Sequence, residues 1–141
     1  MSELGTRMAA IASALQTRFP ARKVRRSYVD FNLMKDADLV AGVYTVMSNG
    51  EDDLVSQAGY IAKDGKQKIR LLAQLRVQEN KDTDEAGALI EEAELVMVDE
   101  VKEFFRNLPP ELCLMVLSGW RQSTQVELPY GWVAFNVTYI S

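Results

Sequence analysis

The sequence has no histidine and only one cysteine among its 141 residues. The missing histidine excludes Ser-His-Asp and Cys-His catalysis, and also zinc sites with histidine ligands. A single cysteine excludes an intrachain disulfide, and nothing in the composition indicates an oxidising compartment. Cys113 lies between Leu112 and Leu114 in an apolar run without a basic neighbour. We therefore expect a buried core thiol at this position and not a nucleophile.

Long apolar runs and nucleotide-binding motifs are absent as well. No stretch of about 18 apolar residues is present, so we expect no membrane-spanning helix. The first twenty residues lack the basic start and apolar run of a signal peptide, so we expect folding in a cytoplasm. The sequence has no GxxxxGK motif, no GxGxxG motif after a strand and no CxxC pair. Phosphate cradles, dinucleotide sites and thiolate metal sites therefore have no basis in the sequence.

Acidic clusters leave a metal-dependent hydrolase or nuclease open as an alternative. Residues 51–53 are three consecutive acids, and Glu91, Glu94, Asp99 and Glu103 fall within one predicted helix. Carboxylate oxygens can bind Mg²⁺ or Ca²⁺. The consecutive acids lack the ligand spacing of a calcium motif, however, and acids on a helix usually form its solvated face. We therefore expect no metal site and no cofactor.

A basic run of nine residues, "RFPARKVRR", raises the alternative of nucleic-acid binding. Two features oppose it. The chain has a net charge of −4. Apart from Phe19, which the first helix is expected to bury, no aromatic residue alternates with these charges. Protein contacts or simple solvation explain the run better.

Two segments have the apolar spacing of amphipathic helices. Residues 3–18 form the first, which ends before Pro20, and residues 82–108 form the second, which ends before Pro109. Asp82 and Glu85 resemble the two ends of a capping box.

Strand patterns occupy most of the remaining sequence. We expect a weak strand within 22–32, a strand around 43–46, a half-buried strand over 68–78 and a last strand within 125–141. The continuous apolar run at 112–119 predicts a central strand that is buried on both faces. The sequence thus predicts one α+β domain over residues 1–141, with a mostly antiparallel sheet and two amphipathic helices packed on one face.

Residues 50–66 show neither the helical nor the strand period and form a long segment for a loop, so we interpret them as a flexible arm.

Charge is unevenly distributed along the chain. Residues 1–80 hold twelve Lys or Arg and nine Asp or Glu, whereas residues 81–141 hold four and eleven. The two parts carry +3 and −7, which suits head-to-tail contact between copies, although simple solvation of both regions is the alternative.

In the order and pattern of these segments, nearly the whole chain resembles the tail terminator proteins of long-tailed bacteriophages of the Mu-like and lambda-like groups. The resemblance rests on "LVAGVYTVM", on "IRLLAQLRVQE" leading into "EEAELVMVDEVKEFF", and on the closing "SGWRQSTQVELPYGWVAFNVTYIS". None of these motifs carries a catalytic signature.

The resemblance implies a structural protein without enzymatic activity. It implies a hexameric ring that caps the tail tube, stops tube polymerisation and offers a surface to head-completion proteins, with DNA only passing through its lumen. It places the protein in the virion at the head-proximal end of the tail, and in the host cytoplasm during assembly. It further suggests that a neighbouring subunit covers one edge of the last strand. Another head-tail joining or baseplate adaptor is the main alternative.

For the subunit and partner contacts we select charged residues of the basic run, the second helix and the arm, together with one aromatic residue of the arm. We expect Arg25 and Arg26 to face acids of helix 82–108 on the adjacent subunit. The full set is Arg22, Lys23, Arg25, Arg26, Glu51, Asp52, Asp53, Tyr60, Glu91, Glu92 and Glu94.

Overall fold

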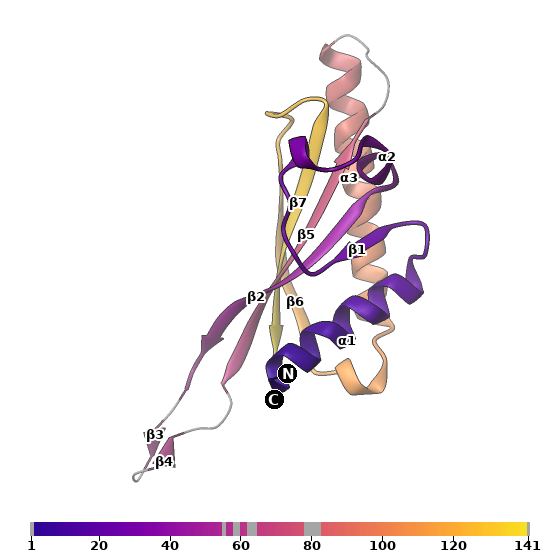
Figure 1. Ribbon diagram of the computed structural model, residues 1–141. Coiled ribbons are helices and arrows are strands. Elements are labelled where there is room, and N and C mark those ends of the chain that lie inside the picture. Colours follow the sequence, from indigo (N-terminus) through magenta and orange to yellow (C-terminus); the bar gives the residue numbers. More distant parts are fainter. Residues whose placement is uncertain (1, 55, 58–59, 62–64, 78–82, 141) are drawn as a thin grey trace.

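The computed structural model describes residues 2–140 except 55, 58–59, 62–64 and 78–82, and gives no side-chain burial for the remainder of 55–64 and of 78–84. Three α-helices and seven strands are described in this part of the chain (Figure 1). In chain order the elements are α1 (Glu3–Arg18), β1 (Lys23–Arg25), the short 3-10 helix η1 (Phe31–Leu33), α2 (Asp36–Ala41), β2 (Val43–Asp52), β3 (Ser56–Gln57), β4 (Tyr60–Ile61), β5 (Lys66–Arg76), α3 (Thr83–Arg106), η2 (Pro110–Leu112), β6 (Met115–Gln122) and β7 (Tyr130–Tyr139).

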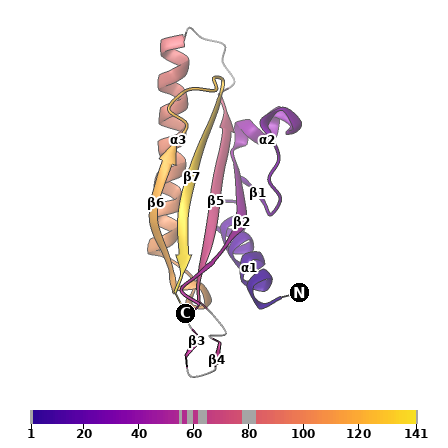
Figure 2. The same ribbon diagram turned by 90° about the vertical axis from the view of Figure 1, so that its left-hand side faces the viewer.

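The main sheet has five strands in the order β1-β2-β5-β7-β6, and Figure 2 shows the last four side by side. Among the described strand pairs of this sheet, β1–β2 alone is parallel, so the predicted α+β fold with a mostly antiparallel sheet is confirmed. Strand β7 pairs with β5 along one edge and with β6 along the other. The expectation that a neighbouring subunit covers one edge of this strand is therefore wrong, because the chain's own strands pair with both.

One face of the sheet carries the hydrophobic core. Val46 of β2 lies opposite Leu71 of β5, which lies opposite Phe135 of β7, and all three are buried. The amphipathic stripes of the two long helices join the same cluster, as their spacing predicts. Their buried members are Met8, Ile11 and Leu15 of α1, and Ile90, Met97, Val98, Val101 and Phe104 of α3.

The apolar run at 112–119 is not the expected central strand. Its first residue, Leu112, ends η2, and β6 lies at the edge of the sheet with only β7 beside it among the described strands. The burial alternates, since Met115 is buried whereas Val116 is exposed. Cys113 precedes the strand and is exposed, so the prediction of a core thiol is wrong. The reason is topological, because the strand order and not the apolar sequence places β6 at the edge of the sheet. Cys113 precedes the strand because residues 110–112 form η2.

The segment before β2 differs from expectation in a second way. Residues 36–41 form α2, which ends at Gly42 with a φ of 87°, a backbone conformation that favours glycine. The strand expected within 22–32 has only three residues.

The expected irregular arm is largely a β-ribbon. Strands β2 and β5 stay paired as far as Asp52 and Lys66, and β3 and β4 pair beyond them. Figure 1 shows this ribbon projecting from the end of the sheet where the two chain termini lie. The flexibility predicted for residues 50–66 stays a prediction.

Candidate functional site

The end of the sheet from which the arm projects is defined by four strands. Tyr139, the last residue of β7, lies opposite Met115, the first residue of β6, and opposite Gln67 near the start of β5. Strand β2 leaves the sheet at the same end, where Asp52 pairs with Lys66. The arm, the start of β6 and the end of β7 are therefore neighbours in space, although they lie far apart in the sequence.

This arm end exposes large apolar side chains. Leu114, Val116 and Ile140 are 47%, 45% and 43% exposed, and Leu54 in the arm is 53% exposed. The exposure of Leu114 and Val116 is not the one expected from the sequence, because the apolar run at 112–119 predicts a strand that is buried on both faces. No local sequence pattern indicates this exposure, because it follows from the edge position of β6.

The acids selected in the arm contact the arm's own residues. Glu51 accepts a hydrogen bond from the Gly65 backbone N–H at 2.9 Å. Asp53 pairs with Lys66 at 3.3 Å, and Asp52 lies 3.7 Å from Lys68. These exposed pairs join the two sides of the ribbon at its base and contribute little to stability individually. The side chain of Tyr60, the fourth residue selected in the arm, lies outside the described residues.

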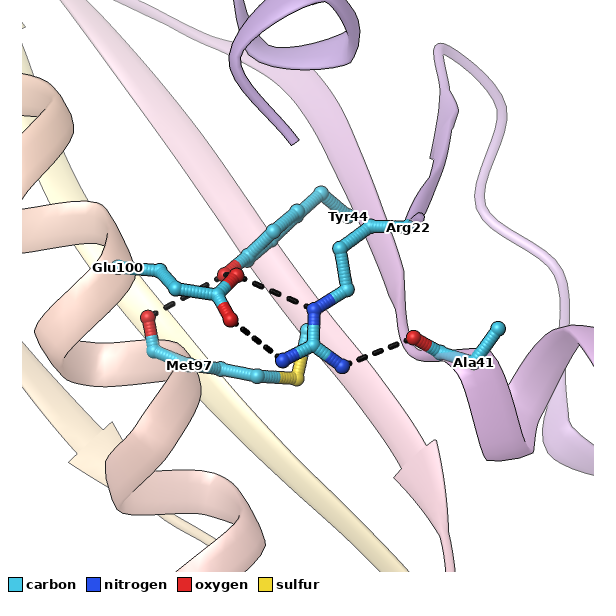
Figure 3. A network of polar contacts seen from close by, with 5 residues as sticks. All are labelled: Arg22, Ala41, Tyr44, Met97 and Glu100. Carbon is cyan, nitrogen blue, oxygen red and sulfur yellow. Dashed lines mark hydrogen bonds and ion pairs between the residues drawn. The ribbon is translucent and has the colours of Figure 1, made fainter. Parts of the chain in front are cut away.

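Arg22 was selected as an interface residue, but it connects elements within the subunit (Figure 3). Its Nε and Nη2 donate to the two carboxylate oxygens of Glu100 on α3, at 3.1 and 2.5 Å. Its Nη1 donates to the Ala41 carbonyl at 2.8 Å, at the end of α2. The same carboxylate accepts from the Tyr44 hydroxyl at 2.9 Å, and that hydroxyl also lies 3.3 Å from the Met97 carbonyl. We call Arg22, Tyr44 and Glu100 the clasp.

The electrostatics of the clasp follow from partial burial beside opposite charge. The hydrogen bond from Arg22 to Glu100 raises the pKa of the guanidinium, and burial only partly offsets this. Burial, followed by the negative charge of Glu100, raises the pKa of the Tyr44 hydroxyl well above its ordinary value. At neutral pH, Arg22 therefore stays charged and the Tyr44 hydroxyl stays protonated.

Glu94 is also buried, although it was selected as a charged interface residue. It is 1% exposed and accepts hydrogen bonds from Gln122 and Ser123 and from the Trp132 backbone N–H. It thereby fixes α3 to the start of β7 and the end of β6. The spacing held a signal for this, because Glu94 falls on the stripe between Ile90 and Met97.

The other selected residues lie at the surface. In and after β1, Lys23 pairs with Asp38 at 3.1 Å, while the Nε groups of Arg25 and Arg26 contact the Ser27 and Val46 carbonyls. On α3, Glu91 and Glu92 are exposed, and Glu91 accepts from Gln125 at 3.0 Å. The structure thus brings Arg22 to Glu100 of its own chain, and leaves Arg25, Arg26, Glu91 and Glu92 at the surface, where contact with another subunit stays a prediction.

The face of the sheet opposite the core, here called the outer face, carries a groove of about 660 Å³. Both signs of charge line it, from Arg70 and Arg121 and from Asp30 and Glu127, beside the Trp132 side chain. The Tyr28 hydroxyl donates to Asp30 at 2.7 Å, and this bond raises the pKa of Tyr28. Such a mixed lining suits a polar protein surface better than an anionic ligand.

The described residues contain neither a metal-binding cluster nor a helix that could span a membrane. They hold no group of three or more acids or cysteines placed to bind a metal ion. No helix among them is long and apolar enough to cross a bilayer. No protein-family model matches the chain, and no curated protein matches it.

Proposed function

We propose that this chain is a structural protein of the bacteriophage tail, of the terminator type. Its copies form a hexameric ring that caps the tail tube, ends tube polymerisation and presents a surface to the head-completion proteins. It acts without catalysis or cofactor, and DNA only passes through the ring. The observation that carries the proposal is the β-ribbon arm, which projects from the sheet beside exposed apolar side chains.

The arm supports a ring because it gives each copy two different surfaces. A contact between unlike surfaces repeats from copy to copy and closes into a ring when the rotation per step allows it. The edge strand β6 offers a second surface beside the arm. The order of helices and strands agrees with the resemblance noted in the sequence, in which an early helix and strand precede a long helix and a closing hairpin.

The test is tube capping. The chain is mixed with polymerising tail-tube subunits encoded in the same phage or prophage genome, and electron micrographs are recorded. We expect short tubes that carry a ring of extra density at one end. Tubes of unchanged length without added density contradict the proposal, and density only at a baseplate or connector assigns the chain to another adaptor class.

A further inference from the structure

The three exposed apolar residues at the arm end of the main sheet form one continuous patch. Met115 lies opposite Tyr139 and Val116 lies opposite Thr138, which places Leu114 beside Ile140. The Ile140 N–H donates to the Leu114 carbonyl at 3.0 Å, which confirms the pairing. Tyr139 stacks against Arg7 of α1 on the core side, so Leu114, Val116 and Ile140 lie on the outer face. We call these three residues the β6 patch.

The β6 patch borders a strand edge without a partner among the described strands. Among the described strands, β6 pairs with β7 alone, so the backbone groups along its other side have no strand beside them. Such an edge can accept an added strand through main-chain hydrogen bonds, with side-chain contacts on the adjoining face. The sequence from 112 to 120 carries no charged residue. Covering the edge over these residues would therefore avoid the cost of burying a charge.

The arm matches this surface in shape and chemistry. It is a ribbon of paired strands, so its outer edges are extended backbone. Residues 54–62 carry no charge, whereas acids and lysines flank them, and Leu54 is 53% exposed. In Figures 1 and 2 the β3–β4 tip lies beyond the end of the sheet and away from the body. The arm of a copy therefore does not cover the same copy's patch.

We propose that the arm of one copy docks along β6 of the next copy and covers its β6 patch. The contact joins two unlike surfaces, so each copy gives its arm to one neighbour and receives the arm of the other. This inference rests on the proposed ring and specifies the contact that closes it. We expect this apolar contact to contribute more to assembly affinity than pairing of Arg25 and Arg26 with acids of α3, because exposed ion pairs contribute little.

Cross-linking tests the contact, because Cys113 is exposed, is the only cysteine and directly precedes the patch. The variant Leu54→Cys adds a second thiol on the arm, and a short bismaleimide is applied to the assembled protein. We expect a ladder of covalent species up to the full copy number. Leu54→Cys combined with Cys113→Ser leaves one thiol per copy and should give nothing beyond dimers. Val126→Cys, in the β6–β7 connection and 71% exposed, serves as the position control and should give no ladder beyond dimers.

A matched pair of charge insertions tests the patch itself. Val116→Glu places a carboxylate within the docked surface and should weaken assembly by about tenfold or more. Val126→Glu makes the same chemical change away from the patch and should leave assembly unchanged. Melting temperatures of both variants should stay near the wild-type value, because both side chains are substantially exposed.

The outcomes separate this contact from the proposed function. Rings that form without a Leu54–Cys113 ladder, or that tolerate Val116→Glu, overturn the contact and leave the ring intact. A protein that stays monomeric and also fails to cap tubes overturns both. A full ladder together with assembly lost only in Val116→Glu supports the contact.

Discussion

Two regions of the subunit differ in whether their side chains have partners within it. One is the contact of Arg18 and Arg22 with α3, here called the seam, and the other is the arm end of the sheet. Along the seam, Arg22 pairs with Glu100 and Arg18 pairs with Glu103, so basic residues of the first part of the chain neutralise acids of the second. At the arm end, Leu54, Leu114, Val116 and Ile140 remain exposed. Some of the opposite charges of the two parts of the chain therefore pair within the subunit. The candidate assembly surface at the arm end is instead apolar.

The largest effect expected in the body comes from its core. Phe104 of α3 is 3% exposed, as its place on the predicted stripe requires. Phe104→Ala should lower the free energy of unfolding by about 3–5 kcal/mol through lost burial and a residual cavity. Leu89→Ala, at an exposed position of the same helix, is the control and should change it little. Urea denaturation measures both. Equal midpoints for Phe104→Ala and wild type would contradict the core assignment.

The clasp should contribute less to the free energy of unfolding than the core, and more than the exposed Arg18–Glu103 pair on the same seam. Glu100→Ala removes the acceptor of Arg22 and Tyr44 and should cost about 1–3 kcal/mol. Glu103→Ala breaks the pair with Arg18, whose side chains are 47% and 46% exposed, and should cost at most about 1 kcal/mol. Denaturant midpoints rank the two variants. If Glu103→Ala lowers the free energy of unfolding more than Glu100→Ala does, the Arg18–Glu103 pair stabilises the fold more than the clasp, which contradicts this ranking.

Alkaline pH should weaken the clasp in a predictable direction. Burial, and then Glu100, raise the pKa of Tyr44 above its ordinary value of 10.0, so the folded state retains a proton that the unfolded chain releases. The stability that Tyr44 contributes is complete below pH about 10 and declines as pH rises further. Unfolding free energy measured from pH 8 to 11 should fall more steeply for wild type than for Tyr44→Phe. Parallel curves would show that Tyr44 titrates normally.

The smallest effect concerns the surface charges first selected for the interface. A solvent-exposed pair between copies, of Arg25 or Arg26 with Glu91 or Glu92, would be worth about 0–1 kcal/mol and would be screened by salt. Arg25→Glu with Arg26→Glu should slow assembly modestly at low salt, and Glu91→Lys with Glu92→Lys should partly restore it. Glu94→Lys is unsuitable for this rescue because Glu94 is buried. Light scattering against salt concentration checks the effect. Assembly as fast as wild type at low salt would mark these arginines as merely solvated.

The sequence predicted the elements with strong periodicity and missed those decided by topology. Residues 3–18, the long helix and strands β5 and β7 follow from apolar spacing alone. Strand β6 has an equally apolar sequence, but its edge position depends on strand order, which no local pattern encodes. Short α2 was missed because its six residues span less than two turns, which is too few to show a helical period.

The sequence predicted where the candidate site lies, in the arm, but not which side chains the surface beside it exposes. The arm at 50–66 was recognised by its length and composition. Charged residues were favoured as contacts, yet Arg22 and Glu94 have partners within the subunit, because helix packing brings distant residues of opposite polarity together. The exposure of Leu114 and Val116 follows from the edge position of β6, which becomes visible only in the assembled sheet.

The most direct test of the account is the native mass of the assembly with and without the arm. Six copies of the 15.9 kDa chain have a mass of about 95 kDa. We expect the wild-type protein at high concentration, or on tail tubes, to form rings of this mass. Deletion of residues 52–63 should leave the melting temperature nearly unchanged and yield only monomers. Rings of full size from the deletion variant, or wild-type protein that never exceeds one copy even with tubes present, would contradict an arm-closed ring.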